Sequence, residues 1–579
     1  MELDGDEYRR IVFLSYDRLL NRAISWKSRR GVEAMKQSAS QIREKIAAVA
    51  LRILLVLALL LFLIFPGALP SVLAAEETYQ VSKVEIRGNF LFAEETLQKA
   101  IQEYLGPRKT VRDLESIQNA IFSSYKQAGY TLVSIAIAAP PDSDGLLTVI
   151  VKEDILRSVK VTGNKYLKEE HIRQALPALK TGHAINTKAL DRQVLVANEN
   201  PSRVIRVALQ TIDVGVFDAI VTVKEGKFIT NSLTLDNTGM GYKGEDNQDP
   251  LRMHYRFVHS GLGARRDATG VLIYSRSPRN TVQQYLAYYQ QPISSWGNSW
   301  YAMAAYSNSK TGLSDSGYGV FNVAGSGQFY SLHYVHPLHR NLNSKLALDV
   351  GLEFHNSVDN TTIYDIDVGP DVNSLPLSIT GLYSWQGTRD SASAAVTYVR
   401  NLPGGYLNDN DAYSRVRPYA TAHYQLWRGN LSYIHHFRKG WIFHTRVDWQ
   451  YTTQPLIPDE QIGLGGARSI RGFREREALG DKGVTASFEL YTPPVTPGLR
   501  FVVFYDAGQF WNYTLDENSL FGSPSFSCIG PTTLSSAGVG LRWTINRWLS
   551  FNADYAYVIK GYITAQHESR LHFELTATF

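Results

Sequence analysis

The residues best suited to do chemistry are an arginine in a glycine-rich segment and an aspartate further along the chain. Arg471 lies between the pair Gly465-Gly466 and Gly472, and glycine allows the positive φ angles of a tightly folded loop. Asp506 lies in a segment whose alternating pattern predicts a β-strand. A guanidinium can donate two parallel hydrogen bonds to a carboxylate. The pattern therefore predicts an ion pair that fastens a folded-back loop, around residues 462–480, to a strand.

The strength expected of this pair depends on the water around it. If the pair lies in a water-filled space, it would stabilise the folded loop by about 1 kcal/mol or less. If it lies in a dry site, the loss of one partner would cost more stability than that. The alternative is that Arg471 is simply exposed. Nearby charges are candidates for a wider network, although a solvated loop surface is expected for most of them; they are Arg468, Arg474, Arg476, Glu475, Glu477 and Glu489.

The segments that must position this pair alternate in the manner of membrane-spanning strands. Within 345–354, Leu, Val and Phe side chains share one face, while Asp349 and Glu353 lie on the other. Residues 441–451 repeat the pattern, with Trp, Phe and Tyr opposite charged and polar residues. Apolar-out and polar-in alternation with aromatic ends is typical of an outer-membrane barrel.

Composition agrees with a barrel rather than with a helical membrane protein. Hydrophobic residues make up 44% of the chain, and tyrosine is abundant at 33 residues. We predict a transmembrane antiparallel β-barrel of about sixteen strands over residues 228–579, with fourteen or eighteen also compatible with the length. Polar turns are expected at 244–249 and 359–360. A soluble sandwich is the alternative, but its outward faces should carry fewer aromatic residues.

The last strand gives a sharp local signal. Leu571, Phe573, Leu575 and the terminal Phe579 fall on one face of an alternating segment, and His572 lies on the other. We expect the apolar face to contact lipid. A soluble edge strand that ends in Phe by chance is the alternative.

Ahead of the predicted barrel lie two copies of a smaller unit. Residues 81–89 and 156–164 are alternating strands that each end in Gly-Asn, a turn dipeptide. We place the first unit at 78–153 and the second at 154–227. Their predicted helices are 94–104, 111–128, 168–176 and 187–197, and their further strands are 131–138, 146–151, 203–210 and 217–223.

Residues 1–75 are expected to be absent from the mature fold. The apolar run 53–65, followed by prolines and small residues, predicts a secretory signal cleaved after Ala74 or Ala75. An uncleaved anchor is the alternative. The long extension ahead of the run has two interpretations. Either the true start of the protein is Met35, or the extension is part of an extended signal region. The single cysteine in the chain excludes an internal disulfide framework.

These patterns resemble a known family. The β-α-α-β-β order of each small unit resembles the polypeptide-transport-associated (POTRA) domain. The run Ile470-Arg471-Gly472-Phe473 resembles the [VI]-R-G-[FY] motif at the tip of the sixth extracellular loop of the BamA/TpsB superfamily, and Phe504-Tyr505-Asp506 resembles its F-x-D strand motif. Two POTRA units, with Ala128-Gly129-Tyr130 and Asn200-Pro201-Ser202-Arg203, resemble the TpsB branch of two-partner secretion transporters, of the haemolysin activator/secretion type.

The resemblance implies a function. It implies an outer-membrane translocator whose periplasmic POTRA domains bind an unfolded, TpsA-like exoprotein and whose barrel secretes it. It also implies that Arg471 and Asp506 form a gate latch with Gly472, Phe473, Phe504 and Glu489. The C-terminal Phe resembles the signature read by the barrel-assembly machinery. Many members carry a plug helix before the first POTRA domain, and little sequence remains for one after the predicted cleavage site.

Other functions are less consistent with the sequence. A BamA-type insertase that assembles other barrels is the alternative function, and a diffusion pore is a third. No phosphate loop or nucleophile elbow is present, so we expect no enzyme activity and no cofactor. The histidines near 333–339 and 435–436 are interpreted as turn or girdle residues, and His567 with His572 as residues of one strand, not as metal ligands. The net charge of +5 is modest, and no nucleic-acid partner is expected.

Overall fold

The computed structural model describes residues 77–238, 251–278, 283–308, 326–358, 362–363, 366–367, 371–515 and 526–579. The predicted signal region and the predicted turns at 244–249 and 359–360 lie outside these ranges. Among the helices in the described ranges, none has both the length and the apolar character required to cross a membrane.

The first small module is a three-stranded sheet covered by two helices. Helix α4 begins at a capping box, in which Thr110 and Asp113 bond each other's backbone, and it ends at Gly129 with a positive φ of 97°. One face of α4 is buried against the sheet. The sheet order is β2-β5-β4, with β1 paired separately to β3. The elements are β1 (Tyr79–Val81), β2 (Lys83–Arg87), α3 (Glu94–Ile101), η2 (Gln102–Tyr104), β3 (Gly106–Lys109), α4 (Val111–Ala128), β4 (Val133–Ile137) and β5 (Leu146–Glu153).

The second module repeats this arrangement. Its sheet order is β6-β8-β7, with β6 parallel and β7 antiparallel to β8. Its apolar core includes Leu156, Ile172 and Val221, each fully buried. The elements are β6 (Ile155–Thr162), α5 (Glu169–Ala175), α6 (Thr187–Ala197), β7 (Arg203–Asp213) and β8 (Val216–Glu225).

The Gly-Asn repeat has the same geometry in both modules. Gly88 and Gly163 have φ angles of 86° and 81°, and an added Cβ would lie 2.2 Å and 2.3 Å from a carbonyl oxygen of the neighbouring strand. In both turns a glutamate at the end of the central strand accepts backbone amides: Glu153 from Phe90 at 2.9 Å and Glu225 from Tyr166 at 2.9 Å. Only glycine fits this close approach, which explains why the dipeptide recurs.

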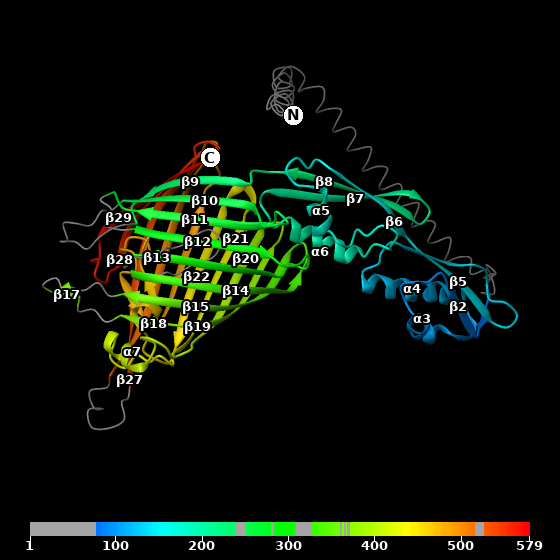
Figure 1. Cartoon of the computed structure of the whole chain (residues 1–579), viewed down its shortest axis with the longest axis horizontal. Coiled ribbons are helices and arrows are strands. Elements are labelled where there is room, and N and C mark those ends of the chain that lie inside the picture. Colours follow the sequence, from blue (N-terminus) through cyan, green and yellow to red (C-terminus); the bar gives the residue numbers. More distant parts are fainter. Residues whose placement is uncertain are drawn as a thin grey trace, which may run out of the picture. The chain divides into compact units, whose positions relative to one another are not determined.

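The rest of the chain closes into an antiparallel barrel (Figure 1). Sixteen strand positions are present in the part of the chain described here, with β18 and β19 both paired to β15. We call the end at which β9 begins the entry end, and the opposite end the far end. The strands are β9 (Ile229–Asp236), β10 (Arg252–Leu262), β11 (Ala268–Arg276), β12 (Gln283–Pro292), β13 (Ser299–Ser307), β14 (Ser326–Arg340), β15 (Ser344–Val358), β18 (Val372–Ser374), β19 (Pro376–Gln386), β20 (Asp390–Asn401), β21 (Gln425–His436), β22 (Ile442–Thr452), β25 (Lys482–Tyr491), β26 (Leu499–Leu515), β27 (Phe526–Thr544), β28 (Leu549–Lys560) and β29 (Ser569–Thr578).

Short elements lie outside the barrel sheet. The segment between β20 and β21 contains α7 (Asn410–Val416). The remaining elements are the pair β16 (Thr362–Ile363) and β17 (Ile366–Asp367), the turns η3 (Arg438–Gly440) and η4 (Pro458–Glu460), and the pair β23 (Ile462–Leu464) and β24 (Ala478–Gly480).

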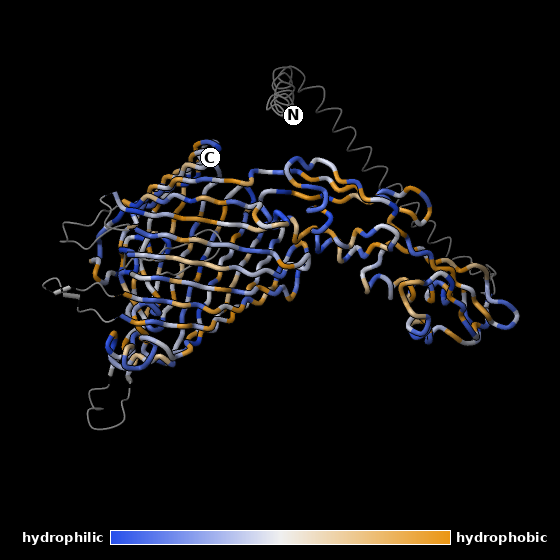
Figure 2. Tube along the Cα trace, in the orientation of Figure 1, coloured by the Kyte–Doolittle hydropathy of each residue, from blue (hydrophilic) through white to orange (hydrophobic). Residues whose placement is uncertain are grey.

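The two faces of the barrel wall differ in polarity. In β15, Val350 and Leu352 point outward and are 36% and 44% exposed, whereas Asp349 points inward and is 6% exposed. Figure 2 shows this close alternation of hydrophobic and hydrophilic residues along the barrel strands. The predicted alternation is thus confirmed: the apolar face suits lipid, and the polar face lines the lumen.

The barrel closes between its first and last strands. β29 pairs with β9 from Glu574↔Asp236 to Thr578↔Ser232. Beyond this ladder, the Asn237 side chain accepts from Phe573 N at 3.0 Å and donates to Leu571 O at 2.6 Å. One side-chain amide therefore takes the place of a strand residue and extends the seam.

Candidate functional site

A short hairpin between β22 and β25 carries the predicted site. Its strands β23 and β24 pair from Ile462↔Gly480 to Leu464↔Ala478. Gly465, Gly466 and Gly472 have φ angles of 106°, 108° and 94°, which lie in the region that glycine tolerates best. These three residues turn the chain, and Arg471 lies at the tip. We refer to residues 456–481 as the inward hairpin.

Apolar side chains fix the inward hairpin to the lumen face of the wall. Ile470 and Phe473 are fully buried and belong to one cluster with Leu534 of β27 and Val558 of β28. Gly508 of β26 makes room for it: an added Cβ there would lie 2.7 Å from Ile470 Cδ1. The hairpin thus packs into the wall as part of a protein core and not as a loose loop.

Arg471 and Asp506 meet in a two-pronged ion pair. Arg471 Nε donates to Asp506 Oδ2 at 2.7 Å, and Nη2 donates to Oδ1 at 2.8 Å. The Arg471 backbone amide also donates to Asp506 Oδ2 at 3.0 Å. The side chains are 2% and 0% exposed, so both charges are removed from water. Of the two cases left open by the sequence, the dry one applies to this pair.

The remaining guanidinium donors are also used. Nη1 donates to Glu489 at 2.7 Å and to Asp554 at 3.5 Å, and Nη2 donates to the hydroxyl of Ser487 at 3.1 Å. Burial alone would lower the pKa of Arg471, but the hydrogen bonds and charge of Asp506 outweigh it and raise that pKa above its ordinary value. The guanidinium is therefore permanently charged, and three acids from three strands compensate it.

The F-x-D pattern places two residues on the lumen face of β26. Asp506 binds the edge of the guanidinium, while the Phe504 ring lies under its plane, 3.5 Å from ring centroid to Arg471 Cζ. Tyr505, between them, points outward and is 44% exposed. Alternation along one strand is the reason that an aromatic ring and an acid can hold the same arginine.

The expectation of a mostly solvated hairpin surface is wrong. Glu475 accepts from the Ala467 amide at 2.8 Å, and Arg476 Nη2 donates to the Pro458 carbonyl at 3.2 Å. Glu477 is buried and accepts from the Thr564 amide at 2.6 Å. A hairpin surrounded by wall leaves backbone groups without strand partners, and the charged side chains satisfy several of them.

Sequence reasoning missed several contacts at the tip: those of Arg471 with Asp554 and Ser487, and one with His572. His572 Nε2 accepts from the Gly472 amide at 3.0 Å, and this side chain is buried. The only signal was that His572 lies on the polar face of the last strand. His567 lies outside β29, which begins at Ser569, so the prediction of both histidines on one strand is wrong.

The C-terminal residues lie at the seam. Leu575 pairs with Leu235 of β9, and the Phe573 amide is bonded by the Asn237 side chain. Phe579 exchanges backbone hydrogen bonds with Asn231 at 2.9 Å and 3.0 Å, and its side chain is 52% exposed.

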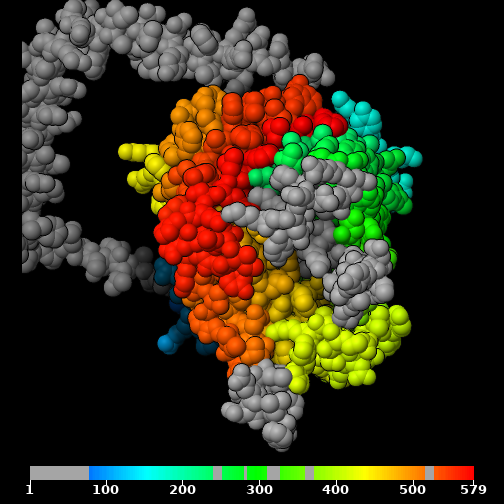
Figure 3. Space-filling view, turned by 90° about the vertical axis from the view of Figure 1, so that its left-hand side faces the viewer, coloured from blue at the N-terminus to red at the C-terminus, as the bar shows by residue number. Residues whose placement is uncertain are grey.

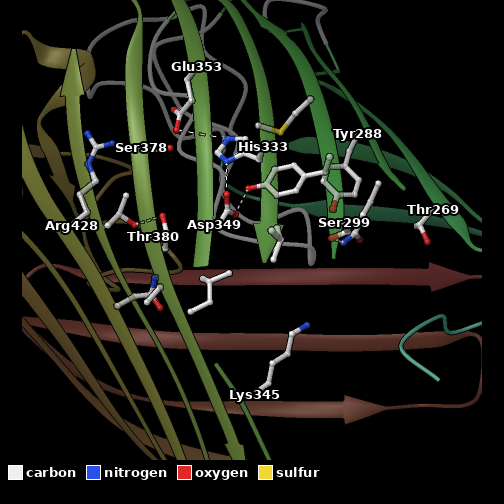
Figure 4. Close-up of a pocket in the computed structure, with 18 of the residues that line it drawn as sticks. Thr269, Tyr288, Ser299, His333, Lys345, Asp349, Glu353, Ser378, Thr380 and Arg428 are labelled. Atoms are coloured by element: carbon white, nitrogen blue, oxygen red, sulfur yellow. Dashed lines mark hydrogen bonds and ion pairs between the residues drawn. The ribbon is translucent and has the colours of Figure 1, made fainter. Parts of the chain in front are cut away.

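The lumen beside the inward hairpin is polar. A cavity of about 1110 Å³ is lined by wall residues and by hairpin residues including Gly463 and Arg468. In Figure 4, His333 points into this space between Asp349, 2.9 Å away, and Glu353. The sequence predicts His333 as a turn or girdle residue; it lies within β14 and faces the lumen, so the turn interpretation is wrong and His333 does not belong to an outward girdle. A register shift near Pro337 keeps the proline inside the strand.

The fold and the site define a class of protein. A closed sixteen-strand barrel with an apolar exterior, a polar lumen and small α/β modules ahead of it is an outer-membrane barrel with periplasmic POTRA domains. The entry end thus faces the periplasm, and the far end faces outward.

The family follows from a comparison with known proteins. Residues 218–542 match the family model of the haemolysin secretion/activation protein ShlB/FhaC/HecB, and residues 79–154 match the ShlB-type POTRA domain. The chain belongs to this family of two-partner secretion transporters.

Relatives and solved structures agree with this placement. The heme/hemopexin transporter protein HuxB of Haemophilus influenzae (strain 86-028NP) is 21% identical over 516 residues, which cover 87% of this chain and 88% of HuxB. The outer membrane transporter CdiB of Dickeya dadantii (strain 3937) is 22% identical over 482 residues, which cover 77% of this chain and 79% of that protein. The solved structure of CdiB from Escherichia coli is similar in fold, with a TM-score of 0.68 at 17% identity over 89% of this chain and 93% of that one.

Proposed function

We propose that this transporter exports an unfolded, TpsA-like exoprotein, which its POTRA domains bind in the periplasm and its barrel passes outward. The observation that carries the proposal is the inward hairpin, which is fixed in a polar lumen by one buried arginine with three acids around it. A passive pore has no need of such a hairpin. A polymer-conducting barrel needs an element that blocks the lumen at rest and can move.

The first module offers an edge for client binding. Among the described strands, β4 pairs only with β5. Ala138 N donates to Thr148 O of β5, so by alternation the Ile137 N–H points away from β5, toward the open edge. An unfolded segment can add to such an edge through main-chain hydrogen bonds that ignore side-chain identity. This mode of binding suits a client recognised before it folds.

Arg471 and Asp506 act as the gate latch, with Gly472 and Phe473 shaping the tip and Phe504 and Glu489 supporting the arginine. Because the pair is dry, breaking it requires replacement contacts rather than water alone. Client segments in the lumen supply such contacts. No nucleotide is involved, and folding of the client outside the cell makes the transfer directional.

Two further partners belong to this proposal. Phe579, with Phe573 and Leu575, forms the signature that the barrel-assembly machinery reads on the last strand. The outward residues of the barrel contact outer-membrane lipids.

The test compares culture supernatants from cells that make the native transporter, no transporter, or Arg471→Ala. Without the transporter, one large protein should disappear from the medium. In cells whose Arg471→Ala barrel still inserts, the amount of that secreted protein in the medium should differ strongly from the native level. Normal export by both Arg471→Ala and Asp506→Ala contradicts the proposal that these two residues form a gate latch. A loss of other outer-membrane proteins with unchanged secretion supports the BamA-type insertase instead.

The capture step has its own test. Ile137→Pro removes the edge N–H and leaves the ladder to β5 intact, because an edge strand tolerates proline on its open side. Binding of the urea-unfolded exoprotein to the purified transporter should weaken, whereas the control Ile137→Val should bind as the native protein does. Equal binding by both variants contradicts recognition at β4.

A further inference from the structure

A second Arg–Asp pair lies at the base of the inward hairpin; its arginine comes from another loop and is 19% exposed, while its aspartate is buried. Arg417 follows α7 in the segment between β20 and β21. Its Nη1 donates to Asp481 Oδ1 at 2.5 Å, and its Nη2 donates to Oδ2 at 2.8 Å. Asp481 is 0% exposed. Both pairs are two-pronged, but the tip uses Nε and Nη2 of its arginine, whereas the base uses Nη1 and Nη2.

Asp481 joins both limbs of the hairpin. It directly follows β24 on the second limb, and its Oδ1 accepts from Leu456 N at 2.9 Å and from Gln461 Nε2 at 3.0 Å on the first. Its Oδ2 accepts from Tyr513 N at 2.8 Å on the neighbouring strand β26. Arg417 adds bonds to the carbonyls of Leu456 at 2.6 Å and Tyr513 at 3.0 Å. One ion pair therefore holds the two hairpin limbs, a barrel strand and the α7 loop together.

The α7 loop is a folded lobe that holds Arg417 in place. We call residues 402–424 the outer lobe; in Figure 3 it is the compact yellow-green group at the barrel end that faces the viewer. Asp409 caps α7 by accepting from Ala412 N at 2.8 Å. Tyr413 is fully buried in one apolar cluster with Leu456 and Ile457 of the first hairpin limb. The lobe and the hairpin base therefore share a core.

A separate contact fixes where the hairpin leaves the wall. Glu460, in η4, accepts from Arg428 Nη2 at 2.9 Å and lies 3.1 Å from His355 Nδ1. Both partners belong to barrel strands. Glu460 thus anchors the first limb to the wall. Asp481 instead ties the two limbs to each other and to the outer lobe, and this tie sets the direction in which the hairpin points.

We propose that Arg417 is a positioning residue for the gate: the outer lobe holds the hairpin inward through Arg417 and Asp481, as a second latch beside Arg471 and Asp506. This inference deepens the proposed function and rests on it. Tip and base belong to one hairpin, so the hairpin leaves the lumen only when both pairs are broken. Contacts that displace the outer lobe from outside then act on the gate directly.

Single-channel conductance of the purified full chain in planar bilayers tests this proposal without any client. Release of the hairpin should appear as openings to higher conductance. Arg417→Ala should raise the open fraction about tenfold or more, because it leaves the buried Asp481 carboxylate without its partner. Because both pairs hold the same closed state, the rise should be by the same factor in the native and in the Arg471→Ala background. Arg415→Ala is the matched control, since Arg415 is an exposed arginine of α7, two residues before Arg417; it should leave the open fraction unchanged.

An open fraction that Arg417→Ala leaves unchanged in both backgrounds overturns the proposal. Compact migration on unheated gels shows which variants hold a closed barrel. If Arg417→Ala does not insert, Arg417→Lys is measured instead, because lysine keeps the charge but cannot bind both carboxylate oxygens as a fork. A smaller rise of the open fraction in Arg417→Lys supports the proposal, and no rise overturns it. Because conductance needs no exoprotein, this result is independent of the secretion assay that tests the proposed function.

Discussion

The guanidinium carbon of Arg471 lies 3.5 Å from the centroid of the Phe504 ring, while the Asp506 carboxylate, on the same face of β26, binds the guanidinium edge. A cation over an aromatic face in a desolvated site is stabilised by about 2 kcal/mol. The strand therefore holds the hairpin tip by two different interactions, of which the ion pair is only one.

Phe504→Leu should keep the apolar contact but lose the attraction of the ring for the cation. A loss of about 2 kcal/mol corresponds to an open fraction about thirtyfold higher, measured by conductance. Phe501→Leu is the control, because Phe501 lies on the outward face of the same strand and is 46% exposed. Equal open fractions in both variants would show that the ring does not hold the arginine.

Arg471→Ala and Asp506→Ala should each destabilise the barrel by about 3–5 kcal/mol, because each leaves an uncompensated buried charge. The double variant should lose less than the sum, since it removes both charges together. The measurement is the temperature at which the barrel loses compact migration on gels. Strictly additive losses in this double-mutant cycle would contradict a direct pair.

Gly508→Ala should displace the inward hairpin. The new Cβ would lie 2.7 Å from Ile470 Cδ1 and 2.9 Å from Leu464 Cδ2, which is closer than packed side chains allow. We expect a destabilisation of about 1–3 kcal/mol and faster tryptic cleavage within the hairpin. Gly381→Ala is the control, because a Cβ at this strand position meets nothing within 4 Å. Unchanged cleavage in Gly508→Ala would refute the close packing of hairpin and wall.

Asn237→Ala should weaken the seam between β9 and β29. It leaves the Phe573 amide and the Leu571 carbonyl without their side-chain partner, at a cost of about 1–3 kcal/mol if water does not replace it. Hydrogen exchange at Phe573 should accelerate. Asn237→Asp separates the two bonds, because aspartate still accepts from the Phe573 amide but cannot donate to Leu571. Slow exchange in Asn237→Ala would show that the ladder alone protects the seam.

The first POTRA module should lose order at its α4 N-terminus in acid. Hydrogen bonds from the Thr110 backbone and side chain hold the pKa of Asp113 below its ordinary value of 3.8. Because the folded pKa is the lower one, this stabilisation is present above the ordinary pKa and is lost as the pH falls through the folded pKa. Amide exchange at the first turn of α4 should then increase below pH 3.8. Asp113→Asn should remove this pH dependence, and an unchanged acid response in that variant would contradict the assignment.

Local periodicity by itself determined much of this protein. The predicted helices at 111–128 and 187–197 agree with α4 and α6 to the residue, because apolar spacing and capping residues are local signals. The inward and outward faces of 345–354 followed from the period of two along a strand. The motif residues Arg471 and Asp506 were identified from their types and neighbours.

Only the tertiary structure decided what surrounds those residues. The contacts of Arg471 with Asp554, of Gly472 with His572, and of Asp481 with Arg417 join segments that are far apart in the chain. Barrel closure and the inward fold of the hairpin bring these segments together, and no periodic pattern encodes which side chains then meet. The dryness of the site has the same origin, since water is excluded by packing between strands and hairpin, a property of the assembled wall and not of any one segment.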